Sequence, residues 1–165
     1  MASILLAKGE APQAETAVQA LLKELSKDDA DSGGQARLLL VRALLDQGKS
    51  LEALKEMVVL NAMVKPSSPR SLRYGALIAS ARVQAATGRQ PNIAPSVDSL
   101  QKIAREAKRA GMRGFELEAR LALGEIELAD GKASAARKDL EEVQREALAN
   151  GYRLIEQRAA RAAGH

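Results

Sequence analysis

Four glycines recur along this chain of 165 residues at nearly equal intervals and in similar surroundings. They are Gly9, Gly48, Gly88 and Gly131, and the intervals between them are 39, 40 and 43 residues. Three of them are followed by an alanine five residues later and by large apolar residues nine and twelve residues later. These apolar sets are Ala14, Val18 and Leu21, then Ala53, Met57 and Leu60, and last Ala136, Leu140 and Val143. Apolar residues three and four apart form one face of an α-helix, and a period of this length indicates a stack of repeated units.

The residues that precede the glycines predict helices as well. An apolar-rich segment of about thirteen residues runs up to each of the last three glycines, as in ARLLLVRALLDQ from Ala36 and ARLALGEIELAD from Ala119. Each repeat is therefore predicted to be a helix, a glycine turn and a second helix. The glycine stands just past the end of the first helix, where a left-handed backbone conformation is needed. No segment is typical of a strand, so the predicted fold class is all-α, a right-handed α-solenoid of helix-turn-helix repeats.

Breaks between the apolar segments set the expected boundaries. Helices are predicted at residues 10–26, 35–47, 50–64, 69–87, 96–110, 115–130, 133–149 and 152–162. They form one helical-repeat domain over residues 1–165, with repeats at about 1–27, 34–65, 68–110 and 115–150 and a terminal helix at 152–162. Gly111, Gly114 and the pair Asn150-Gly151 mark further turns.

Three connections are expected to be irregular. The segment from Asp28 to Gly34 is predicted to be a loop in which Ser32 caps the next helix. Ser68 is predicted to cap a helix that has Pro69 at its first position. The segment from Arg89 to Pro95 contains two prolines and is predicted to be an insertion that lengthens the third repeat.

Composition agrees with an all-helical chain and removes most catalytic chemistry. Aromatic residues make up 2% of the chain, which is rich in the strong helix formers Ala, Leu, Glu, Arg, Lys and Gln. There is no cysteine, and the single histidine is the last residue, His165. These counts exclude disulfides, thiolate metal sites and cysteine nucleophiles, and they leave no histidine inside the fold. We therefore expect no enzymatic activity, no cofactor and no metal site.

The glycine alignment brings out a resemblance to the tetratricopeptide repeat (TPR) family. Small residues near the start and in the middle of each first helix carry it: Ala36, Ala76 and Ala119, then Val41, Ala81 and Gly124. The segment LALGEIELADGKASAARKDL matches the family pattern best. The large residues that the family places in its helices are replaced by Arg37, Leu77 and Arg120 and by Leu44, Gln84 and Glu127, and Pro66 is an approximate closing proline. The chain resembles a divergent member with a longer period.

A second resemblance concerns the tail, from about Phe115 to Ala160. This segment is similar to the C-terminal helical-repeat regions that bacterial regulators and eukaryotic-like Ser/Thr kinases carry behind a catalytic or DNA-binding domain. The resemblance implies a bacterial protein. No apolar run approaches the roughly 20 residues of a membrane span, so we expect a cytoplasmic chain with no membrane contact. A piece of a larger membrane-anchored protein would share this pattern.

A solenoid of hairpins predicts a binding surface. Its first helices line a continuous concave face that suits an extended peptide or a partner helix. The equivalent groove positions are Leu38, Ile78 and Leu121, followed one turn later by Arg42, Arg82 and Glu125. This mixture is typical of a peptide site, although the same apolar residues would also suit the core between helices. The expected function is a non-enzymatic protein-protein interaction scaffold, with a purely structural segment of a longer protein as the other interpretation.

The net charge of +4 has its origin in one segment. Residues 99–113 contain five basic residues against Glu106 alone, namely Lys102, Arg105, Lys108, Arg109 and Arg113. The spacing places Lys102, Arg105 and Arg109 on one helix face, and Arg113 extends the row past the turn. Such a row can bind phosphates, so the alternative function is binding of nucleic acid or of an anionic surface. The absence of stacking aromatics in this stretch argues against nucleic acid.

Two short motifs lack the residues that their chemistry requires. Gly48-Lys49-Ser50 resembles the end of a phosphate-binding loop, but Ala43 stands where such a loop needs a glycine. The cluster Asp28, Asp29 and Asp31 lacks the later ligands of a calcium loop. A solvated loop and an ordinary helix start explain these residues.

The first repeat is shorter than the others. Eight residues precede Gly9, so Ile4, Leu5 and Leu6 are predicted to lie on a helix of two turns at most. A helix this short is marginal alone, and an uncovered terminal repeat exposes apolar surface. We therefore expect a fragment of a longer repeat protein whose edge favours self-association as a homodimer.

Overall fold

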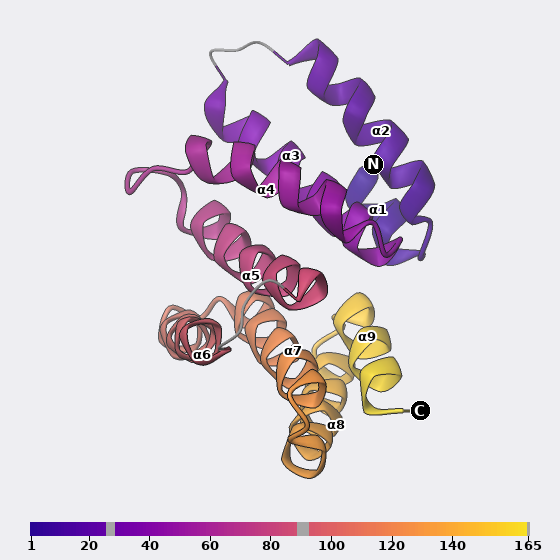
Figure 1. Cartoon of the computed structure of the whole chain (residues 1–165), viewed down its shortest axis with the longest axis vertical. Helices are drawn as coiled ribbons and strands as arrows, with labels where there is room; N and C mark the ends of the chain where they lie inside the picture. Colours follow the sequence, from indigo (N-terminus) through magenta and orange to yellow (C-terminus); the bar gives the residue numbers. More distant parts are fainter. Residues whose placement is uncertain (26–28, 89–92, 165) are drawn as a thin grey trace. The chain divides into compact units, whose positions relative to one another are not determined.

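The computed structural model describes residues 1–25, 29–88 and 93–164, and this part of the chain is all-α, as predicted. Helix covers 83% of the described residues, and none of them lies in a strand (Figure 1). The helices are α1 (Ala2–Ala7), α2 (Ala11–Glu24), α3 (Ala30–Asp46), α4 (Ser50–Met63), α5 (Arg70–Thr87), α6 (Ala94–Arg109), α7 (Arg113–Ala129), α8 (Ala133–Ala149) and α9 (Arg153–Ala163). Within this part of the chain, no helix has the length and apolar character needed to cross a membrane.

The chain divides into two compact units, Met1–Arg89 and Gln90–His165. In the first unit, each of α1 to α4 packs against the helix that follows it, and α3 also contacts α1 and α5. In the second unit, α6 to α9 pack in the same sequential way, and α7 also contacts α9. The expected third repeat, residues 68–110, thus has its two helices α5 and α6 in different units.

The predicted glycine turns are present. Gly48 has a φ of 73°, and the backbone N–H groups of Gly48 and Lys49 donate to the carbonyl oxygens of Leu45 and Leu44 at 3.0 and 2.9 Å. This pair of bonds closes the end of α3 and requires the left-handed conformation that glycine adopts without strain. Positive φ values recur at Gly9, Gly88, Gly111, Gly131 and Gly151. The periodic glycines therefore end helices, as their spacing predicted.

The start of α3 differs from the prediction. The helix begins at Ala30, so the expected loop from Asp28 to Gly34 is wrong for its described part, while Asp28 lies outside the described residues. The cap is Asp29, whose Oδ1 accepts from the backbone N–H of Ser32 at 3.0 Å; Ser32 is not the capping residue. Hydrogen bonding to the side chain of Ser32 and to its backbone N–H holds the pKa of Asp29 below its usual value.

Two other boundaries shift. Ser68 does not cap α5, because its Oγ accepts from the backbone N–H of Lys65 at 3.0 Å, and Pro69 is the N-cap itself. Within the expected insertion from Arg89 to Pro95, residues 89–92 lie outside the described part of the chain. Its last two residues, Ala94 and Pro95, form the start of α6.

The cores of both units consist mainly of small and branched aliphatic side chains. The repeated alanines Ala14, Ala53 and Ala136 are all 0% exposed, as the periodicity predicted. The first core centres on Val41, Leu60, Leu72 and Val83, and the second on Leu117, Leu121, Leu140 and Val143. Leu21 on α2 was expected in the core, but it is 43% exposed.

Close helix contact explains the glycine in the middle of α7. A Cβ atom built on Gly124 would lie 2.7 Å from Cγ and 2.8 Å from Cδ2 of Leu140 on α8. Carbon atoms in good contact are about 3.5 to 4.0 Å apart. Leu140 is fully buried, so it cannot turn away into solvent. The small residue expected at this position therefore lies at a helix crossing.

We expect that replacing Gly124 by leucine lowers the free energy of unfolding by about 2 to 3 kcal/mol, because overpacking forces buried neighbours out of their rotamers. Urea unfolding followed by circular dichroism measures the change. Ala129→Leu, at the exposed end of the same helix, is the matched control and should stay within about 0.5 kcal/mol of the parent. A Gly124→Leu protein as stable as the parent would contradict the close contact of α7 with α8.

A polar cluster joins three helices of the first unit. The Oε2 atom of Glu15 accepts from Lys49 Nζ at 2.7 Å and from Gln47 Nε2 at 2.8 Å. The hydrogen bond from Lys49 is the main cause that lowers the pKa of Glu15 below 4.5, and Gln47 adds to it. The cluster thus ties the start of α2 to the turn between α3 and α4.

This pKa shift predicts a pH dependence of stability. Because the folded state lowers the pKa of Glu15, its contribution is present above pH 4.5 and is lost as the pH falls through the folded-state value. Glu15→Gln should cost about 0.5 to 1 kcal/mol at pH 7, since Lys49 is largely exposed. Urea unfolding across this pH range should show the difference from the parent shrinking below pH 4.5. A difference that stays constant with pH would contradict the assignment.

Candidate functional site

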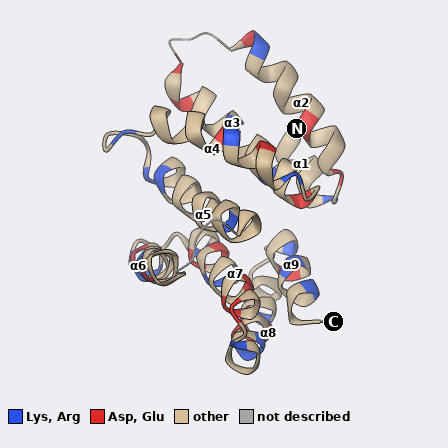
Figure 2. Ribbon diagram, in the orientation of Figure 1, with Lys and Arg blue, Asp and Glu red and all other residues tan. Residues whose placement is uncertain are grey.

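A cavity of about 310 Å³ opens in the second unit, among α6, α7 and α8. Charged side chains dominate its walls. Figure 2 marks the positions of charged residues along the ribbon of α6, α7 and α8 in blue and red. The lining residues are Ala104, Arg105 and Lys108 from α6, Arg113, Glu116 and Arg120 from α7, and Glu142 and Glu146 from α8. The cavity therefore has four cationic side chains and three carboxylates around it.

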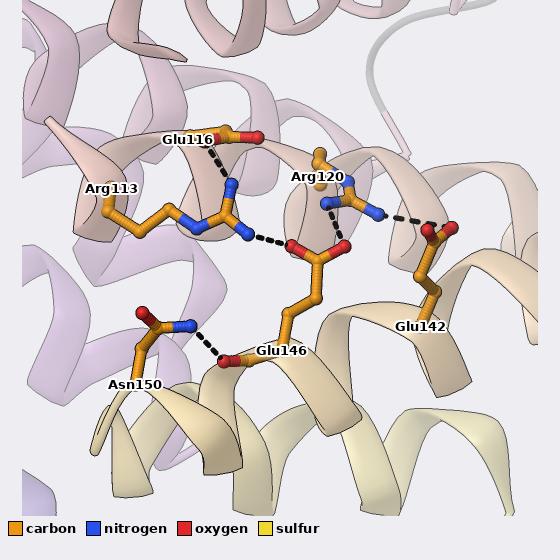
Figure 3. Close-up of polar contacts among 6 residues, drawn as sticks. All are labelled: Arg113, Glu116, Arg120, Glu142, Glu146 and Asn150. Atoms are coloured by element: carbon orange, nitrogen blue, oxygen red, sulfur yellow. Dashed lines mark hydrogen bonds and ion pairs between the residues drawn. The ribbon is translucent and has the colours of Figure 1, made fainter. Parts of the chain in front are cut away.

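Helical spacing brings these side chains together. Arg113, Glu116 and Arg120 follow one another at three and four residues, so they share one face of α7. Glu142 and Glu146 are four residues apart and share one face of α8. Because α7 and α8 form an antiparallel hairpin around Gly131, the two charged faces meet, and Figure 3 shows the side chains pointing toward one another.

An unbroken series of ion pairs links the two helices. Arg113 Nη1 donates to Glu116 Oε2 at 2.6 Å, and Arg113 Nη2 donates to Glu146 Oε2. Arg120 Nη1 donates to the second oxygen of Glu146 at 3.0 Å, and Arg120 Nη2 lies 3.3 Å from Glu142 Oε2 (Figure 3). Glu146 is thus held by two guanidinium groups at once. Its main-chain oxygen also accepts from Asn150 Nδ2 at 2.8 Å.

Glu116 is the most buried member of the network. The residue is 3% exposed, whereas the side chain of Arg113 is 34% exposed. The hydrogen bond to Glu116 is the largest cause that raises the pKa of Arg113, and the charge of Glu146 adds to it. Arg113 therefore stays charged and compensates a carboxylate that would otherwise be buried without a partner.

The α6 wall of the cavity differs from the other two. Arg105 and Lys108 are exposed, and neither forms a hydrogen bond or ion pair with another described residue. Lys102 and Arg109 lie on the same helix and are exposed as well, but they do not line the cavity. Arg105 and Lys108 are therefore not in ion-pair contact with the carboxylates of α7 and α8.

The structure divides the predicted basic row. Lys102, Arg105 and Arg109 are exposed on α6, as a solvated row requires. Arg113 does not extend it, because its guanidinium turns to Glu116 and Glu146. Lys108, which lay outside the predicted row, lines the cavity instead.

The apolar anchors of the predicted groove are in the cores. Leu38, Ile78 and Leu121 are 4%, 2% and 1% exposed, which corrects their expected place on an open face and favours the core interpretation. For Leu38 and Leu121 the burial follows from the number of helices around α3 and α7, each of which packs against several others. Arg42, Arg82 and Glu125 are half-buried and already have polar or charged neighbours.

Sequence reasoning missed the α8 half of the network. Glu142 and Glu146 recur at four residues opposite a row of arginines, and this complementary spacing was the available signal. Glu116, Glu142 and Glu146 each form an ion pair with a guanidinium group of Arg113 or Arg120, which fixes the positions of these carboxylates. No group of three metal-ligating side chains is found among the described residues.

We expect Arg113→Met to destabilise the protein by about 2 kcal/mol, because it leaves the buried Glu116 without its cation. The figure is below that of a fully buried pair because Arg113 is partly exposed. Glu116→Met should cost less, since Arg113 keeps Glu146. The double variant should be more stable than Arg113→Met alone, and thermal unfolding of all three measures the order. A double variant less stable than either single one would contradict this account.

Comparison with known proteins returns no match of any kind: no protein-family model, no curated protein and no solved structure is similar to the chain. Any functional conclusion depends on the packing, burial and charges described above.

Proposed function

We propose that the chain is a right-handed solenoid of TPR-like hairpins that works as a non-enzymatic protein-protein interaction scaffold. The observation that carries the proposal is a repeated register between alternate helices. Gly34 on α3 lies against Leu72 on α5, 38 residues later, and Leu38 lies against Gly75, 37 residues later. The two contacts run in the same order along both helices, so α3 and α5 are parallel.

The second unit repeats this register. Gly114, at the start of α7, lies against Tyr152, the N-cap of α9, and the two residues are again 38 apart in the sequence. Parallel alternate helices at a constant offset are what a stack of equivalent hairpins produces. Such stacks expose helix faces that are available to other proteins, which supports a scaffold rather than a catalyst.

The face that suits a partner best is the outer side of α4. The inner side of this helix is fully used, because Ala53, Met57 and Leu60 are buried in the first core. On the outer side, Leu51, Val58 and Val59 are 57%, 65% and 40% exposed. Leu51 and Val58 are two turns apart on one face, with the aliphatic stem of Lys55 between them. A helix that is apolar on both sides is typical of one that is covered on both sides.

The groove positions are weaker candidates after their burial. Interfaces draw most of their binding energy from a few apolar or aromatic anchors. Leu38 and Ile78, the apolar groove positions predicted beside Arg42 and Arg82, are in the core. The two arginines therefore have no exposed apolar anchor among the predicted groove residues. We therefore assign the main contact with the partner to the outer side of α4. Variants of Arg42 and Arg82 then test the predicted groove for comparison.

Capture experiments with a lysate of the source cell test the proposal. The double variant Leu51→Glu/Val58→Glu should lose the captured partner, because a charge in each apolar contact is costly to desolvate. It should keep its helical circular dichroism spectrum, since both side chains are exposed. Leu148→Glu, which changes an isolated side chain that is 50% exposed on α8, is the matched control and should retain the partner.

Two further variants separate the alternatives. Loss of the partner in Arg42→Glu/Arg82→Glu alone would move the contact to the first-helix face. Binding of RNA or DNA by the parent at near-physiological salt, lost in Arg105→Glu/Arg109→Glu and falling steeply with added salt, would replace the scaffold by the nucleic-acid alternative.

A further inference from the structure

We propose that the cavity among α6, α7 and α8 binds a carboxylate group on an acidic segment of a partner polypeptide. The inference rests on the proposed scaffold function and adds the chemistry of what is recognised. It uses a different part of the molecule from the outer side of α4, so the two can fail separately.

The charge of the cavity is the first step of the argument. Four cationic side chains line it and three carboxylates oppose them, so one positive charge is in excess. Arg113 and Arg120 engage all three carboxylates. Their two charges leave this network at −1, whereas Arg105 and Lys108 place +2 on the α6 wall, so the cavity as a whole carries +1 and one carboxylate bound at the α6 wall would bring it to zero.

The second step concerns the donors on that wall. Arg105 and Lys108 are three residues apart, so both project from one side of α6 into the cavity. Neither has a hydrogen-bonding or ion-pair partner among the described residues. A guanidinium offers paired N–H groups that match a carboxylate, and the ammonium adds a second charged donor. A bound carboxylate would supply the acceptor that these donors lack.

The third step separates a carboxylate from other ligands. No aromatic side chain lines the cavity to stack on a base, which argues against a nucleic acid. A metal cation is disfavoured because the carboxylates are already held by arginines. The volume of about 310 Å³ is at the lower end of ligand sites and accommodates a side chain of a partner rather than a large cofactor.

Fluorescence anisotropy of the full chain tests the inference, with a fluorescein-labelled peptide of alternating Glu and Ser as the probe. Arg105→Gln/Lys108→Gln should weaken binding about tenfold or more, as expected for loss of charge-assisted hydrogen bonds. Lys102→Gln/Arg109→Gln removes the same charge from the same helix outside the cavity, and it should change binding by less than about threefold. The Gln-Ser peptide should not bind.

A second pair of variants predicts a gain. Glu142→Gln raises the positive excess of the cavity, and the Glu142 side chain is 53% exposed, so the fold should tolerate the change. It should tighten binding of the Glu-Ser peptide several-fold through its charge on the cavity wall. Glu141→Gln, one residue earlier and outside the cavity, is the matched control and should leave the affinity close to that of the parent.

Three results would overturn the carboxylate site. They are equal losses in the two double variants of α6, tighter binding of an oligothymidylate than of the Glu-Ser peptide, and no binding of that peptide by either the parent or Glu142→Gln. If any of them occurred while capture through α4 persisted, the acidic-segment inference would be wrong and the scaffold proposal would stand. Loss of capture through α4 with intact peptide binding would show the reverse.

Discussion

Close approach of neighbouring helices is the constraint on which both units depend. At two of the crossings a leucine of one helix occupies the space that a side chain would fill on the other, as Leu38 does at Gly75 and Leu140 does at Gly124. A Cβ atom at either glycine would lie 2.4 or 2.7 Å from that leucine, closer than packed carbon atoms come. This requirement explains why the chain uses small and aliphatic residues and almost no aromatics.

The turns and the repeated alanines could be predicted from the sequence because both depend on local rules. A glycine just past a helix end indicates a left-handed backbone conformation at that position. The spacing of Ala14, Ala53 and Ala136 relative to the apolar residues after them indicates one buried helix face. The groove could not be predicted in the same way. Periodicity identifies one buried face of a helix, but α3 has neighbours on several sides, so residues assigned to a free face, such as Leu38, are buried as well.

The ion network shows a second limit of sequence reasoning. Spacing on α7 places Arg113, Glu116 and Arg120 on one face, but it does not say which helix they face. The spacing alone is therefore compatible with a basic row that runs through Arg113. In the structure, the α7–α8 hairpin places Glu146 opposite Arg113, and the two side chains form an ion pair. Likewise, a helix with Ser32, Gly33 and Gly34 in its first turns is disfavoured by local propensity. Tertiary contact with Leu72 and Met63 makes that helix acceptable, and only the packed structure contains this information.

The energetics of the network bear on why the charges are present at all. Replacing a buried ion pair by packed aliphatic residues is often neutral or stabilising. Glu116, 3% exposed, carries the desolvation cost of a charge that an apolar residue would avoid, and Arg113 offsets part of it. Stability alone therefore does not account for a charged α7–α8 face. The proposed carboxylate site would account for it, because arginines anchored by Glu146 keep the cavity walls polar and the α6 cations would then face an incoming acid.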